Sequence, residues 1–97
     1  MQSYVLLINF TELGVKNIRD TLDRARSFYG TIEKVGGKVR EHVYTLGEYD
    51  IAMVTEFPDD ETAAGAIFQL ASLGNVRTTT MRAFTDEEFA GILSRVS

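Results

Sequence analysis

Residues 4–10 read Y-V-L-L-I-N-F, and this stretch decides the fold. Successive side chains of a β-strand point to opposite faces of its sheet. Tyr4, Leu6 and Ile8 would therefore share one face, and Val5 and Leu7 would share the other. Both sets are apolar, which is typical of a central strand that is covered on both sides.

The segments that follow alternate between helical and strand-like patterns. Apolar residues recur at helical spacing over residues 22–35, with Thr21 as a candidate N-cap and Gly36-Gly37 as a left-handed stop. Residues 38–46 and 50–57 suit two strands joined by a tight reversal. A second helix is predicted to start in residues 58–61 and to stop at residues 74–75. Residues 75–84 suit a fourth strand, and residues 85–88 have the spacing of a capping box for a last helix.

The order of these elements is β-α-β-β-α-β-α, which predicts an α+β fold with an antiparallel sheet, of the ferredoxin-like split β-α-β class. In that class the strands lie in the order 4-1-3-2, and the two crossover helices cover one face of the sheet. Whichever of these two sets faces the helices, the other would then leave a large apolar patch without a cover. We therefore expect a homodimer or a higher homo-oligomer in which a second copy buries this face.

Composition sets limits on the class of protein. A chain of 97 residues predicts a single domain over residues 1–97, and 44% hydrophobic with 25% charged residues is ordinary for a globular protein. There is no cysteine, which excludes a disulfide framework, a thiol nucleophile and a thiolate metal site.

Charge and hydropathy suggest where such a domain works. The net charge of −4 argues against non-specific binding to nucleic acid, because such binding depends on Lys and Arg. The longest apolar run is residues 4–8, far short of the ~20 residues that span a bilayer, and the first three residues lack the basic start of a secretory signal. We expect a cytoplasmic protein with no nucleic-acid or membrane partner.

The turn of residues 45–50, T-L-G-E-Y-D, resembles the one that gives the GYD domain family its name. Residues 11–14, 36–38, 58–61, 74–80 and 82–85 are also similar to that family, so the resemblance covers nearly the whole chain. Leu22 stands where members often have a proline that starts a helix. The resemblance implies a dimeric α/β barrel, in which two sheets pack face to face, and a superfamily whose members often bind small or aromatic molecules in a cleft. It implies no particular activity.

Candidate ligand-binding residues come from the expected sheet. We expect the end of the second strand and the start of the third to share one sheet edge with the start of the first and the end of the fourth. This would bring together Tyr44, Asp50, Tyr4 and Arg82. A carboxylate, a guanidinium and two phenols could orient a small aromatic or carboxylate ligand. The alternative is that Asp50 caps the turn and Arg82 pairs with a surface acid.

Further candidates lie elsewhere on the chain. Asn9, Glu56 and Arg77 are expected to approach one another at the opposite edge, and Thr11 begins a connection of about ten residues that could form a lid. Thr80 could donate a hydrogen bond to a ligand or pack as a β-branched strand residue. His42 is the only histidine, so it is either a ligand contact or a passive residue on an edge strand. We predict no metal site and no cofactor.

Three functions remain open from the sequence. The first is a homo-oligomeric domain that binds a small molecule and has no assigned reaction. The second is a cofactor-independent isomerase or monooxygenase acting on a small substrate, aromatic or not, in which Asp50, Tyr44 or His42 transfers a proton. The third is a purely structural assembly module. No catalytic residue can be assigned, because no clear acid–base pair is present.

Overall fold

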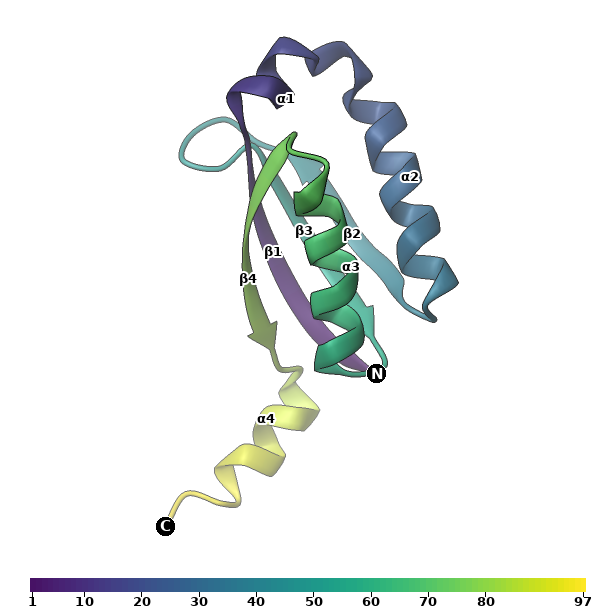
Figure 1. Ribbon diagram of the computed structural model, residues 1–97. Coiled ribbons are helices and arrows are strands. Elements are labelled where there is room, and N and C mark those ends of the chain that lie inside the picture. Colours follow the sequence, from purple (N-terminus) through teal and green to yellow (C-terminus); the bar gives the residue numbers. More distant parts are fainter.

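The computed structural model describes residues 1–97, and its central feature is a four-stranded antiparallel sheet (Figure 1). The strands are β1 (Gln2–Phe10), β2 (Lys38–Tyr44), β3 (Ile51–Phe57) and β4 (Val76–Ala83). They lie in the order β2-β3-β1-β4. The predicted order 4-1-3-2 and the predicted fold class are confirmed.

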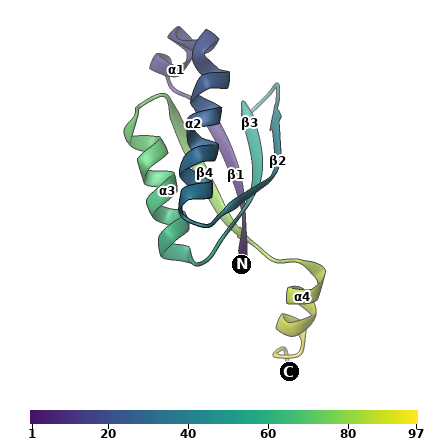
Figure 2. The same cartoon turned by 90° about the vertical axis from the view of Figure 1, so that its right-hand side faces the viewer.

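Two long helices, α2 (Thr21–Lys34) and α3 (Asp60–Ser72), lie against the same face of the sheet (Figure 2). A short helix, α1 (Glu12–Lys16), and a 3₁₀ turn, η1 (Ile18–Asp20), occupy the connection after β1. The sequence pattern predicted a loop there and missed both. A last helix, α4 (Asp86–Leu93), follows β4.

Most of the predicted helix ends are present. The side chain of Asp59 accepts a hydrogen bond from the Thr62 amide at 2.8 Å and caps α3. Thr85 and Glu88 form the predicted capping box of α4. Gly36 has a φ of +84°, the left-handed stop expected after α2. The prediction for Thr21 was wrong, because Thr21 is the first residue of α2 and its hydroxyl donates to the carbonyl of Ile18.

The pairing register contradicts the predicted grouping of side chains at the sheet edges. β1 and β3 run antiparallel with Ile8 opposite Ile51, so the start of β3 lies beside the end of β1. Tyr44 and Asp50 therefore lie at one end of the sheet, whereas Tyr4 and Arg82 are paired near the other end. The predicted set of four is thus split in two.

The second predicted group fails for the same reason. Asn9 and Arg77 are paired with each other, but Glu56 lies opposite Ser3 at the far end of the sheet. The error has one source. In an antiparallel pair the start of one strand meets the end of its partner. β1 and β2 both run antiparallel to β3, so the end of β1, not its start, lies at the same end of the sheet as Tyr44 and Asp50.

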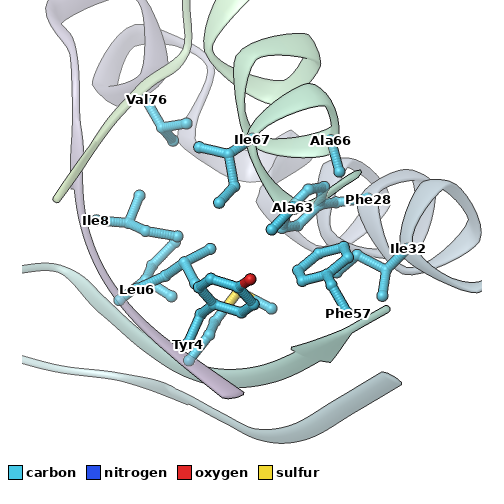
Figure 3. Close-up of a cluster of buried hydrophobic side chains, with 12 residues drawn as sticks. Tyr4, Leu6, Ile8, Phe28, Ile32, Phe57, Ala63, Ala66, Ile67 and Val76 are labelled. Atoms are coloured by element: carbon cyan, nitrogen blue, oxygen red, sulfur yellow. The ribbon is translucent and has the colours of Figure 1, made fainter. Parts of the chain in front are cut away.

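The hydrophobic core lies between the sheet and helices α2 and α3 (Figure 3). It consists of twelve buried residues, namely Tyr4, Leu6, Ile8, Phe28, Ile32, Ile51, Met53, Phe57, Ala63, Ala66, Ile67 and Val76. Alternate residues of β1 contribute to it, and the side chain of Leu6 is fully buried. This is the helix-covered face of the sheet.

The opposite face of the sheet, here called the open face, has no cover within the chain. The register places Glu41, Val54, Val5 and Met81 in one row across the strands, and Val43, Ala52, Leu7 and Thr79 in the next. Val43 and Met81 are 50% and 44% exposed, and Val5 and Leu7 are only half-buried. The open face therefore has an apolar centre that is exposed to solvent, with Glu41 and Thr79 at its two sides.

Candidate functional site

A small pocket lies under α2 on the helix-covered face. Phe28 and Tyr29 of α2, His42 and Tyr44 of β2, and Met53 of β3 contribute to its walls. Its volume is about 50 Å³ and its lining is mostly hydrophobic. Two of the predicted ligand-binding residues, His42 and Tyr44, thus meet in one pocket.

His42 is the polar centre of this pocket. Its Nδ1 forms a hydrogen bond with the Tyr29 hydroxyl, and its ring lies 4.8 Å from the ring of Tyr44, centroid to centroid. Its Nε2 is buried and has no hydrogen-bond partner. Burial lowers the pKa of His42 below 6.5, because desolvation disfavours the charged ring. The imidazole is therefore neutral at pH 7 and offers one unused donor or acceptor.

Burial also acts on Tyr44. Desolvation, and to a lesser extent the nearby Tyr29, raises the pKa of the Tyr44 phenol above 10. A phenol in this state donates a hydrogen bond and does not act as a base at pH 7. The one charged side chain in the lining is Arg24, whose guanidinium donates to the carbonyls of Asn17 and Gly14. The pocket can therefore orient a polar atom, but it holds no carboxylate that would accept a proton.

The pocket is small for a ligand site. Pockets for drug-sized ligands measure about 300–1,000 Å³, and one water molecule occupies about 30 Å³ of liquid. The volume of about 50 Å³ under α2 accommodates a water molecule or the end of a small group, not a whole aromatic ring. A larger ligand would have to displace side chains at the rim, where Tyr44 is 47% exposed.

Asp50 and Thr11 have structural roles at the same end of the sheet. Asp50 accepts a hydrogen bond from the Phe10 amide through Oδ2, and its own amide donates to the Ile8 carbonyl, both at 2.9 Å. These bonds join the turn of residues 45–50 to the end of β1. Thr11 caps α1 and donates through Oγ1 to the Gly74 carbonyl at 2.6 Å. The predicted cap role of Asp50 is thus replaced by a bond to another strand.

Tyr4 and Arg82 belong to a polar cluster at the opposite end of the sheet. The Tyr4 hydroxyl donates a hydrogen bond to Asp60 Oδ1. Burial, followed by this bond to Asp60, raises the pKa of Tyr4 to about 12. Arg82 lies 3.9 Å from Asp60 and 3.6 Å from Glu88, and its guanidinium lies 4.7 Å from the Phe84 ring centroid. Arg82 thus pairs with nearby acids, as the alternative interpretation held.

A shallow groove of about 420 Å³ runs between α3 and β4 beside this cluster. Thr78 and Thr80 of β4 and Phe68 of α3 contribute to it, and Phe68 is 72% exposed. Arg82 closes one end of the groove with its donors already engaged, because it also donates to the carbonyls of Ser3 and Ala83. The groove therefore offers an exposed aromatic ring together with the hydroxyls of Thr78 and Thr80.

Two further properties bear on the predictions made from the sequence. No group of three or more His, Cys, Asp or Glu side chains is arranged to hold a metal ion. None of the helices combines the length and the apolar character that crossing a membrane requires.

Comparisons with known proteins agree with this architecture. The model of the GYD domain family matches residues 4–93. The chain belongs to the GYD domain family. A relative from Thermus thermophilus, named glutamine synthetase and cystathionine beta-lyase binding protein, is 31% identical over 84 residues, which cover 86% of this chain and 88% of that protein.

Solved structures share the fold. The crystal structure of TTHA0845, also from Thermus thermophilus, has a TM-score of 0.56 and 24% identity, and the match covers 88% of this chain and 95% of that one. RPA0582, a protein of unknown function from Rhodopseudomonas palustris, has a TM-score of 0.54 and 13% identity, with 87% and 82% covered. The names of these relatives assign no reaction to this GYD domain.

Sequence reasoning missed two features of the site. Tyr29 was assigned only to the apolar stripe of a helix, although its hydroxyl meets His42 across 13 positions. Asp60 was assigned only to a helix start, although it binds Tyr4 across 56 positions. A tyrosine within an apolar stripe was the one available signal, because a buried phenol needs a hydrogen-bond partner.

Proposed function

We propose that this GYD domain is a homodimeric binding module without a catalytic role, and that the open face is where two copies meet. The exposed apolar rows of that face carry the proposal, because monomeric proteins rarely leave a broad apolar sheet surface in water. The candidate acid–base residues support a non-catalytic role. Asp50 is bound to a backbone amide, Arg82 to nearby acids, and Tyr4 is buried with a pKa of about 12.

The dimer is tested by measuring mass in solution across a range of concentrations. The wild type is expected to be a dimer and the variant Leu7→Glu a monomer, because the new charge would be buried at the interface. Phe68→Glu is the matched control, since Phe68 is an exposed apolar residue on α3, away from the open face. A wild type that stays monomeric, or a Leu7→Glu variant that stays dimeric, would contradict the proposed interface.

The partner is proposed to be another protein, in the cytoplasm. The relative from Thermus thermophilus is named for binding glutamine synthetase and cystathionine beta-lyase, and it aligns over most of this chain. Purified glutamine synthetase and cystathionine beta-lyase from the same host, each presented to the immobilised dimer, test this directly. Saturable binding of at least one enzyme is expected, and serum albumin serves as the negative control. Failure of both enzymes to bind would remove this partner class.

A second candidate function is binding of a small molecule under α2, as the sequence analysis proposed. The buried, unpartnered Nε2 of His42 favours it, because an unsatisfied polar atom at a pocket wall is a ready contact for a ligand. Methanol and formamide are suitable probes, since each presents a polar atom and is small enough for the volume of about 50 Å³ under α2. Their addition is expected to shift the ¹⁵N resonances of His42, and a His42→Phe variant should lose the response. Unchanged resonances at saturating probe would rule out the site.

A further inference from the structure

Arg24 is a cation without a counter-charge in the lining of the pocket under α2. It lies near the start of α2 and is half-buried. None of the ion pairs of the chain includes it, whereas Arg26, two positions along the same helix, pairs with Asp23 at 2.8 Å. A half-buried charge that lacks an opposite charge is costly, so an anion that reached Arg24 would be bound favourably.

The guanidinium of Arg24 is held in place and still has free donors. It makes three hydrogen bonds, to the Asn17 carbonyl at 2.8 Å, the Thr21 hydroxyl at 3.2 Å and the Gly14 carbonyl at 3.5 Å. All three acceptors are neutral. Because an arginine side chain carries five N–H donors, the remaining N–H groups are available to an acceptor from outside the chain.

Two neutral donors on β2 lie in the same pocket. Burial, followed by Tyr29, raises the pKa of the Tyr44 phenol, and the positive charge of Arg24 opposes this rise. The guanidinium therefore lies close enough to act on the phenol. When Tyr29 donates to Nδ1 of His42, the neutral ring carries its proton on the buried, unpartnered Nε2. The polar groups of the pocket thus favour a ligand with acceptor oxygens.

The apolar part of the lining limits the rest of the ligand. Phe28, Met53 and Leu70 contribute to a volume of about 50 Å³, which holds a short alkyl chain but not a ring. No Asp or Glu lines the pocket, so an ammonium group on the ligand would find no charged acceptor there. Amino acids are therefore poor candidates.

Space is also present on the other side of Arg24. A hollow of about 160 Å³ lies between α2 and α3, and Arg24, Phe28, Leu70 and Leu73 line both this hollow and the pocket under α2. The guanidinium thus borders open space as well as the apolar pocket. A charged group can contact Arg24 there without being enclosed by apolar side chains.

We infer that the pocket under α2 binds a small monocarboxylate, with its carboxylate on Arg24 and its short alkyl chain among the apolar side chains. The carboxylate supplies the counter-charge that Arg24 lacks, and a guanidinium can bind it through two parallel N–H···O bonds. The Tyr44 hydroxyl and His42 Nε2 are the neutral donors beside it. This inference rests on the small-molecule site proposed above as the second candidate function, and it names the ligand class.

Three probes of similar size test the ligand class. Propionate, propanamide and free alanine are each titrated into ¹⁵N-labelled full-length protein at constant ionic strength, and the amide resonances of residues 24 and 42–44 are followed. Propionate is expected to bind saturably and roughly 10- to 100-fold more tightly than propanamide, because only the carboxylate pairs with a guanidinium. Alanine should bind no better than propanamide. Equal affinities for propionate and propanamide would overturn the inference.

Two arginine variants locate the anion. Arg24→Gln should abolish the preference for propionate over propanamide, whereas Arg26→Gln, on the same helix, should keep it. Because Arg24 also holds the connection before α2, Arg24→Lys is included as a variant that keeps the charge. It should retain part of the preference, since an ammonium lacks the paired geometry of a guanidinium. An undiminished preference in Arg24→Gln would contradict the assignment to Arg24.

The outcomes separate the ligand class from the site itself. If methanol and formamide shift the His42 resonances but propionate binds no more tightly than propanamide, the site under α2 stands and the carboxylate class is wrong. If none of the probes shifts a resonance of the pocket, both are wrong. Neither result bears on the homodimer, because the pocket lies on the helix-covered face.

Discussion

The two faces of the sheet are built from the same strands, but one is buried within the chain and the other is exposed to solvent. On β1, Tyr4, Leu6 and Ile8 are between 0% and 4% exposed beneath α2 and α3, whereas Val5 and Leu7, one position along, remain half-buried. The alternation of the strand makes both faces apolar, but the chain has crossover helices for only one. Burial within the chain therefore stabilises the monomer through one face and leaves the other available for association.

The largest expected effect is a difference in the free energy of unfolding between alanine variants of two neighbouring residues, Leu6 and Leu7. Leu6→Ala opens a cavity in the core and should lower the free energy of unfolding by about 2–5 kcal/mol at any protein concentration. Leu7→Ala should cost little in the dissociated monomer, and its cost should grow with protein concentration because the dimer forms through that face. Urea unfolding at two concentrations measures both. Equal costs, independent of concentration, would contradict the division between the faces.

A loss of stability of intermediate size is expected at the end of the sheet where Asp50 binds the end of β1. Asp50→Asn weakens the bond from the Phe10 amide to a charged acceptor, and we expect a loss of about 1–2 kcal/mol. Urea unfolding is measured in the Leu7→Glu variant, which is expected to be monomeric, so that the loss caused by Asp50→Asn is not mixed with any change in dimerisation. Asp20→Asn is the control, because Asp20 makes no capping hydrogen bond through its side chain. A loss of similar size in the control would show that Asp50 contributes nothing specific.

A smaller difference in the free energy of unfolding is expected between two helix caps, one on the packed helix α3 and one on the exposed helix α4. Asp59→Ala removes the cap of α3 and should cost about 1 kcal/mol of global stability. Thr85→Ala removes the cap of α4 and should leave the unfolding of the monomeric background unchanged within about 0.5 kcal/mol. It should instead lower the helix signal in circular dichroism. A cost for Thr85→Ala as large as that for Asp59→Ala would place α4 in the cooperative core.

The smallest effect is the pH dependence contributed by His42 on the helix-covered face. Its pKa is lowered by burial, so at low pH the unfolded chain binds a proton more readily than the folded chain does. The free energy of unfolding should fall as the pH drops from about 6.5, and this fall should end below the folded-state pKa. Unfolding at about pH 7.5 and about pH 5.5 should show a larger loss for the wild type than for His42→Gln. Equal losses would mean that His42 is as solvated in the folded state as in the unfolded chain.

The sequence did not predict which side chains of the candidate site lie close together. The sequence indicated which polar residues lie on strands and turns, but their grouping depended on strand direction. Asp50 lies beside Phe10, and Tyr4 lies beside Asp60, because β1 runs antiparallel to β3. The bond between Tyr29 and His42 depends on how α2 sits over β2, a packing angle that no local pattern encodes.

The sequence by itself determined the four strands, the three longer helices, the order of these elements and the apolar character of residues 4–8 on both sheet faces. Alternation along residues 4–10, the caps at Asp59 and Thr85 and the left-handed Gly36 act over a few positions, so they can be recognised locally. Only the tertiary structure decided which side chains meet, how small the pocket under α2 is, and that α4 has no buried residue. Those properties depend on register and packing between residues far apart in the chain, where a shift of one position moves a side chain to the other face.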